Sequence, residues 1–238
     1  MTATLRAPLT EADVRAALGT VVDPELDEPI TDLGFVKDVR VDGDSVTVTL
    51  QLPTYFCAPN FAYIMAADAK AAVGTLEEVG SCTVTLFDHH ASDEIDQGLA
   101  SGKDFDETFA GQTAGVGLSG VRSLFDRKAF LARQEQLYRS LVAAGMPAGE
   151  VARLRLGDLP DTGEARRYLE RRARLGLDTR ADAPLLVTPA GQPIAEEEVD
   201  RHMRFARTIS VSIEGNASFC RGLLATRYGT TASKEVHT

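Results

Sequence analysis

The strongest constraint on the fold is a change in apolar spacing between residues 45 and 73. From Ser45 to Leu52, valine and leucine alternate with threonine and glutamine, which is typical of a strand with one buried face. From Pro59 to Val73 the apolar residues recur at intervals of three and four, which indicates an amphipathic helix. A strand followed at once by a helix and a further apolar segment is the pattern of a β-α-β unit, so the sequence predicts helices packed on a sheet.

The flanking segments extend this unit to a complete small domain. A helix is expected after Thr10, with Thr10 as its N-cap. Residues 35–41 and 45–52 are expected to pair as a hairpin across Asp42-Gly43, a dipeptide that favours a tight turn. Residues 79–87 are the third predicted strand. The order predicts a small α-β-β-α-β domain, of α+β or α/β class, with a three-stranded mixed sheet.

The charge distribution and one glycine-rich stretch divide the chain. Residues 1–110 contain 20 acidic and 6 basic side chains, whereas residues 111–238 contain 15 acidic and 19 basic ones. Residues 110–120 contain four glycines, a composition typical of linkers. We therefore predict a domain over 1–109, a linker over 110–121 and a mainly α-helical domain over 122–238. In the second domain we expect helices over 123–145, 148–156, 163–177 and 217–228, a hairpin over 185–194 and a strand over 209–213.

Composition narrows the compartment and the classes of partner. The chain has no apolar run of bilayer length and no apolar core of a secretory signal, so we expect no membrane segment. The chain has three cysteines, an odd and small number, so a framework of disulfides is not expected. This favours a reducing compartment and predicts a cytoplasmic protein. The net charge of −10 and the scarcity of aromatic residues near the arginines of 163–177 argue against nucleic-acid binding. Those arginines are expected to form a solvated face or to dock on an acidic protein.

The predicted topology gathers polar side chains at one edge of the sheet. The loop before the first strand, the loop after the second and the loop after the third meet there, and ligands bind at such an edge in open α/β sheets. Cys57 also precedes a helix N-terminus, which stabilises a thiolate. Thiolate, imidazole and carboxylate are ligands of iron and zinc. The residues predicted at this edge are Asp23, Glu25, Thr54, Cys57, His89 and His90.

Three segments, taken in order, resemble a known family. Val22-Asp-Pro-Glu-Leu26, Ile30-Thr-Asp-Leu-Gly-Phe-Val36 and Leu52-Pro-Thr-Tyr-Phe-Cys57 are similar to the small domain typified by SufT and PaaD, over roughly residues 8–100. That family acts in iron–sulfur cluster assembly and in the maturation of metal-dependent oxygenases. The resemblance implies that Asp23 and Cys57 belong to one site.

The chain departs from the family pattern in two places. Ala58 separates Cys57 from Pro59, where the family places proline directly after the cysteine. Phe87-Asp-His-His90 stands where the family has a proline and a tryptophan. This second change is consistent with a protein-binding loop that has become a metal-binding one, or with loss of the cluster chemistry.

The other cysteines and the two histidines have competing interpretations. Adjacent residues of an extended segment point in opposite directions, so at most one of His89 and His90 is expected to be a good ligand. Cys82 shares a strand face with valine and leucine and is assigned to the core. Cys220 either lies buried in a last helix or folds back as a second thiolate beside Cys57.

The leading functional hypothesis is a non-catalytic assembly factor. It would bind iron or an iron–sulfur cluster transiently, with zinc as the alternative metal, and deliver it to a client apo-metalloenzyme such as an oxygenase. Its partners would be that client and the assembly proteins, and a homodimer is left open. The predicted metal ligands are Cys57, His89, His90 and Cys220, with Asp23, Glu25 and Thr54 in support.

Two other hypotheses remain. The first is a thiol-dependent enzyme with Cys57 as nucleophile and His89 or His90 as base. The sequence contains no P-loop and no strand-linked GxGxxG, so no catalytic residue is assigned. The second is an adaptor that binds a client without metal.

Overall fold

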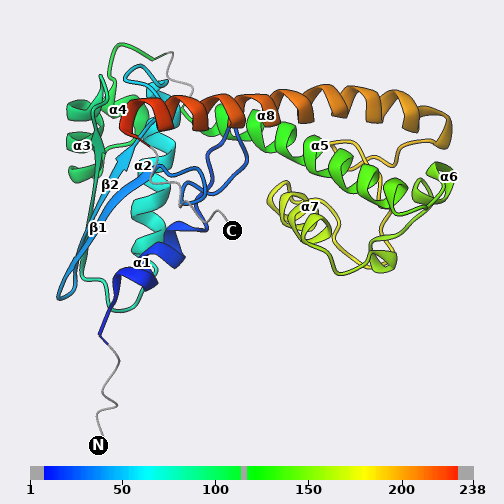
Figure 1. The fold of residues 1–238 in the computed structure, drawn as a ribbon, viewed down its shortest axis with the longest axis horizontal. Coiled ribbons are helices and arrows are strands. Elements are labelled where there is room, and N and C mark those ends of the chain that lie inside the picture. Colours follow the sequence, from blue (N-terminus) through cyan, green and yellow to red (C-terminus); the bar gives the residue numbers. More distant parts are fainter. Residues whose placement is uncertain (1–7, 114–116, 230–238) are drawn as a thin grey trace, which may run out of the picture. The chain divides into compact units, whose positions relative to one another are not determined.

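The computed structural model describes residues 8–113 and 117–229, which fall into two compact units. The first unit combines the chain up to Leu118 with the residues from Asn216 onward, and the second is Ser119–Gly215. The sequence-based boundaries place 216–238 with the helical domain, whereas the contacts of its described part, 216–229, are with the N-terminal one. Figure 1 shows the red end of α8 (Val199–Tyr228) beside the blue and cyan elements of the first unit.

The first unit has the predicted order of elements, followed by two further helices. Its elements are α1 (Glu11–Leu18), β1 (Val36–Asp42), β2 (Ser45–Gln51), α2 (Pro59–Val73), β3 (Ser81–Phe87), α3 (Ser92–Ala100) and the short α4 (Phe105–Thr108). The strands form one sheet in the order β1-β2-β3, with β1 antiparallel and β3 parallel to β2. The predicted α-β-β-α-β domain with a mixed three-stranded sheet is therefore confirmed.

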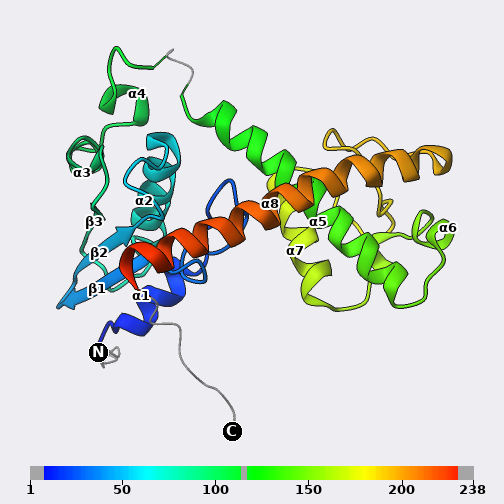
Figure 2. The ribbon, with the colours of Figure 1, turned by 45° about the horizontal axis from the view of Figure 1, so that its top comes forward.

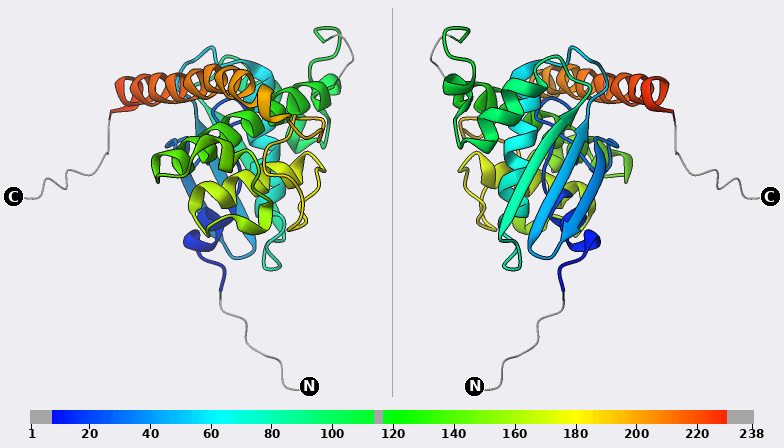
Figure 3. Two further views of the ribbon diagram at one scale, coloured as in Figure 1. Left: turned by 90° about the vertical axis from the view of Figure 1, so that its right-hand side faces the viewer. Right: turned by 90° about the vertical axis from the view of Figure 1, so that its left-hand side faces the viewer.

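Side-chain alternation in β2 decides which face of the sheet is covered. Val46, Val48 and Leu50 are almost fully buried, whereas Thr47 and Thr49 on the other face are only half-buried. Figure 3 (right) shows the three strands in front of α2, which packs against β3 and continues the core. Cys82 of β3 is partly buried and packs against this core. Because β2 and β3 are parallel, their carboxyl ends lie side by side at one edge.

The second unit is mainly helical and has its own core. It contains α5 (Ser119–Ala143), α6 (Ala148–Val151), the 3₁₀ turns Leu156–Asp158 and Glu196–Glu198, α7 (Gly163–Arg174) and α8 up to Gly215. Its core includes Phe130, Leu137, Tyr168 and Leu185. A mainly helical region after the small domain was predicted and is confirmed.

One local prediction in this unit is wrong, and one is confirmed. The predicted strand over 209–213 lies inside α8, because Met203, Ala206 and Ser210 bury one face at helical spacing and outweigh the strand preference of the β-branched residues. The predicted short hairpin over 185–194 is present, with an antiparallel bridge between Val187 and Pro193 and backbone hydrogen bonds from Thr188 to Gln192 and from Ile194 to Leu186.

The arginines of α7 do not all face solvent. Arg172 is 1% exposed, and its guanidinium donates to the carbonyl oxygens of Asp178 and Pro184 and to the Tyr168 hydroxyl at 2.6, 2.8 and 3.0 Å. Arg171 is also buried and contacts Asp126 at 3.2 Å. The expectation of a fully solvated arginine face is therefore wrong for these two residues. Among the described residues, no helix is both long and apolar enough to cross a membrane.

Candidate functional site

The loops after β2 and β3 are joined by direct hydrogen bonds. The backbone N–H of His90 donates to the Tyr55 carbonyl at 3.0 Å, and the His89 ring bonds the Cys57 carbonyl through Nε2 at 2.8 Å. The loop before β1 reaches the same edge, since the Gln51 N–H donates to the Phe35 carbonyl at 2.8 Å. These contacts hold the segment around Cys57 in a fixed conformation.

Asp23 organises the loop before β1. It is 6% exposed, and its Oδ1 accepts hydrogen bonds from the backbone N–H groups of Glu25 and Leu26, each at 2.8 Å. Burial raises the pKa of the Asp23 carboxyl to about 6, although the two N–H donors oppose this shift. Asp23 is thus a structural residue of its turn and also a negative charge at the edge of the sheet.

Cys57 lies just before the first turn of α2. Pro59 occupies the start of the helix, and Ala58 as N-cap provides no side-chain hydrogen bond to the free backbone N–H groups. The Cys57 sulfur is 3.3 Å from the Thr54 hydroxyl and is partly buried. Thr54 therefore contacts the thiol directly.

The two predicted histidine ligands make hydrogen bonds to the backbone. The Ala91 N–H donates to His89 Nδ1 at 3.2 Å, so Nε2 carries the proton that is donated to the Cys57 carbonyl. His89 is 3% exposed, and burial lowers its pKa, which favours this neutral ring. His90 is exposed and donates from Nδ1 to the Tyr55 carbonyl at 3.0 Å. His89 thus has no ring nitrogen left for a metal, whereas His90 keeps Nε2.

The C-terminal part of α8 brings Cys220 to this edge. Its side chain is partly buried against the core of the first unit. Burial, together with the nearby charges of Asp23, Cys57 and Glu25, raises the pKa of the Cys220 thiol to about 11. Cys220 lies in the last helix, α8, as one of the two alternatives predicted, and its thiol is partly buried.

Other contacts hold this part of α8 in place. Arg221 pairs with Glu28. Arg227 donates to the Leu52 carbonyl at 3.1 Å and to the Asp88 carboxylate at 2.6 Å. Sequence reasoning did not assign these residues to the site, because the pattern around 209–213 suggested a strand and separated the last helix from the rest of α8.

The donors at this edge do not form a complete metal cage. Among residues 8–113 and 117–229, no group of three or more His, Cys, Asp and Glu side chains has metal-binding geometry. Cys57, His89, His90 and Cys220 therefore do not form a joint four-ligand site in this structure. The thiols of Cys57 and Cys220 both pack against the core of the first unit, and the charges of Asp23 and Glu25 act on Cys220, so soft thiols and harder carboxyls lie in one region.

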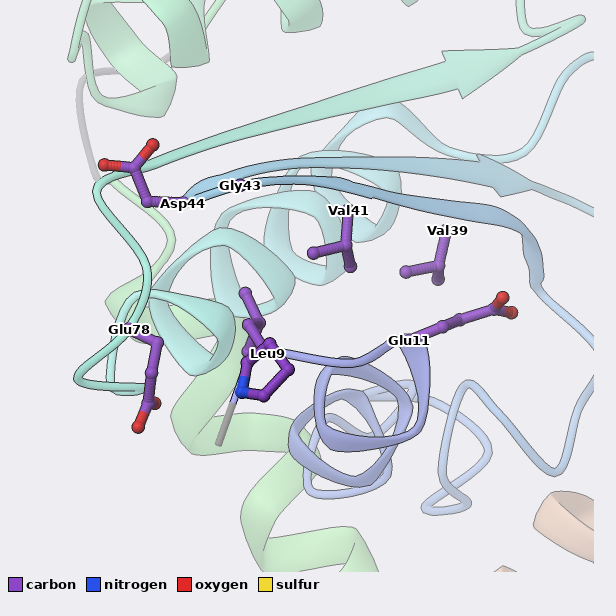
Figure 4. Close-up of a pocket in the computed structure, with 8 residues that line it drawn as sticks. Leu9, Glu11, Val39, Val41, Gly43, Asp44 and Glu78 are labelled. Atoms are coloured by element: carbon purple, nitrogen blue, oxygen red, sulfur yellow. The ribbon is translucent and has the colours of Figure 1, made fainter. Parts of the chain in front are cut away.

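An open cavity of about 670 Å³ lies at the opposite end of the sheet, by the β1–β2 turn. Figure 4 shows Leu9, Val39 and Val41 on its walls and the carboxylates of Glu11, Asp44 and Glu78 around it. Carboxylates without a thiol or imidazole in the described lining do not match an iron–sulfur site. The edge with Cys57 is the better candidate.

Comparison with known proteins identifies the family of the N-terminal domain. The family model described as "Iron-sulfur cluster assembly protein" matches residues 11–86, which include Asp23 and Cys57. The uncharacterized protein MJ1129 of Methanocaldococcus jannaschii is 37% identical over 92 residues, or 38% of this chain and 95% of that protein. The "Fe-S protein maturation auxiliary factor YitW" of Bacillus subtilis is 40% identical over 75 residues, or 31% of this chain and 72% of that protein. Through its N-terminal domain, the chain belongs to the iron–sulfur cluster assembly protein family.

Proposed function

We propose that this chain is a maturation factor that binds iron or an iron–sulfur cluster transiently at Cys57 and delivers it to a client apo-metalloenzyme, such as an oxygenase. The observation that supports the proposal is the position of Cys57 just before α2, 3.3 Å from the Thr54 hydroxyl and joined through its carbonyl to His89 of the loop after β3. Family membership supports the role, and the B. subtilis relative is named as an iron–sulfur maturation factor.

The incomplete ligand set suits transfer better than storage. A metal held by two thiolates keeps coordination positions that a donor protein or a client can fill. Both thiols must lose their protons when they bind metal, so binding is coupled to proton release. Zinc would bind the same ligands, and His90 Nε2 is a further donor within the same loop pair.

The thiol-enzyme alternative has less support. A general base must reach the proton of the nucleophile, yet both ring nitrogens of His89 bond the backbone, and the Cys57 sulfur is 3.3 Å from the Thr54 hydroxyl rather than paired with an imidazole. We therefore propose no catalytic residue. Reduced thiols at the site favour a reducing compartment, and we place the protein in the cytoplasm with assembly proteins as its partners.

A transfer assay tests this proposal. The full chain is loaded anaerobically with iron and sulfide, separated from excess reagent and mixed with a purified apo-oxygenase that requires an iron–sulfur cluster. We expect the cluster absorption to move to the client and its activity to appear faster than with free iron and sulfide. A chelator in solution should not block this direct transfer. Transfer no faster than from free reagents would contradict delivery.

A further inference from the structure

We propose that the surface around Cys57 is a docking site for an arginine-bearing helix, and that residues 216–228 of α8 occupy it within the same chain. A client helix of the same chemistry would then displace this segment to reach the metal site. Only one part of this inference rests on the proposed function, namely that the competing helix belongs to a client protein. The contacts described next stand without it.

The surface itself is acidic at its rim and apolar at its centre. Glu25 and Glu28 flank it on the loop before β1, and Asp88 flanks it after β3. Gly34 lies between them and leaves room for a side chain of the docked helix, since Leu224 Cδ2 lies only 3.2 Å from where a Gly34 Cβ would be. The N-terminal half carries 20 acidic against 6 basic side chains, so a basic partner is favoured.

Residues 216–228 of α8, the docked segment, match both the apolar centre and the acidic rim of this surface. Ala217 is 1% exposed, and Cys220 and Leu224 pack against the core of the first unit. At its edges, Arg221 and Arg227 meet Glu28 and Asp88. A helix that fits this surface therefore has small and apolar residues on the side that packs against the domain. It has arginines at the edges of that side, where they meet the acidic rim.

The relatives indicate that this surface need not be covered by the same chain. Ninety-two residues account for 95% of the M. jannaschii protein, so that protein has room for the small domain but for little beyond it. It has no length for a counterpart of α8. In this chain, residues 216–228 of α8 pack on that surface.

Helix α8 has a weak point at the start of the docked segment. Gly215 lies at the boundary between the two units, inside a helix of 30 residues, and nothing lies within 4 Å of the place where its Cβ would be. A glycine inside a helix lowers its stability relative to alanine. Release of residues 216–228 can therefore begin at Gly215 without unfolding the rest of α8.

Alkylation of Cys57 measures this release. In the metal-free full chain, we expect Arg221→Ala/Arg227→Ala to raise the iodoacetamide labelling rate of Cys57, read by mass spectrometry, about tenfold. Both substitutions lie on α8 and leave Cys57 and its own loop unchanged, so an increase reports exposure of the thiol. Arg201→Ala, which breaks an exposed ion pair on α8 in the second unit, is the matched control and should change nothing. Gly215→Ala should slow labelling.

A peptide in trans tests the docking surface. A labelled peptide of residues 214–229 should bind Arg221→Glu/Arg227→Glu protein, in which the resident segment is repelled, and should bind wild type far more weakly. Binding should weaken with salt, and a peptide with both arginines replaced by glutamate should not bind. Equal Cys57 labelling in wild type and the alanine double variant, or no peptide binding to the glutamate variant, would overturn the proposal. Neither readout uses iron, so failure of metal delivery would leave both results intact.

Discussion

Asp23→Ala is expected to destabilise the N-terminal domain by about 2–3 kcal/mol at neutral pH, because the N–H groups of Glu25 and Leu26 lose their acceptor. Asp23→Asn is expected to stay within about 1 kcal/mol of wild type, since its side-chain oxygen can accept both bonds. Asp32, exposed in the same loop, provides the matched control as Asp32→Ala. Urea unfolding followed by hydrogen exchange in β2 and β3 measures these differences.

The Asp23 carboxyl also makes stability depend on pH. Its folded pKa of about 6 is above the ordinary value of 3.8, so the folded state holds its proton more tightly than the unfolded state does. The stability contributed by this group is therefore complete below about pH 4 and is lost as pH rises through about 6. Asp23→Asn should flatten this part of the profile, and an unchanged slope would contradict the assignment.

The second large effect is expected from Cys220→Ala. Removal of one of two neighbouring thiols should weaken iron binding at least about tenfold, since one strong ligand is lost. Cys82→Ala should bind iron like wild type, because Cys82 packs against the core from β3. Anaerobic titration with ferrous iron against a competing chelator gives the affinities. Equal affinities for wild type and Cys220→Ala would remove Cys220 from the site.

Much of the small domain is predictable because its signals are local. The alternation over 45–52 and the helical spacing over 59–73 each specify one element, and the Asp42-Gly43 turn joins the strands with Gly43 at φ +61°. In the second unit the signals conflict. The β-branched residues at 209–213 suggest a strand, and only tertiary burial on one face makes them helical.

The part of the site that depends on strand topology could be predicted from the sequence. The meeting of the loops after β2 and β3 follows from parallel strands, and this places Cys57 next to His89. The ring contacts of His89 depend on side-chain geometry that no spacing encodes. The position of Cys220 depends on how the end of α8 packs against the core of the first unit, more than 160 positions after Cys57 in the chain.

The most direct test of the account is the iron content of anaerobically purified wild type and Cys57→Ala, with their absorption spectra. The account predicts that wild type, as purified or after reconstitution with iron and sulfide, carries stoichiometric iron with thiolate-to-iron absorption bands. It predicts that Cys57→Ala loses both while keeping its fold by circular dichroism. A wild-type chain that takes up no iron after reconstitution, or a Cys57→Ala chain that keeps it, would contradict a metal site centred on Cys57.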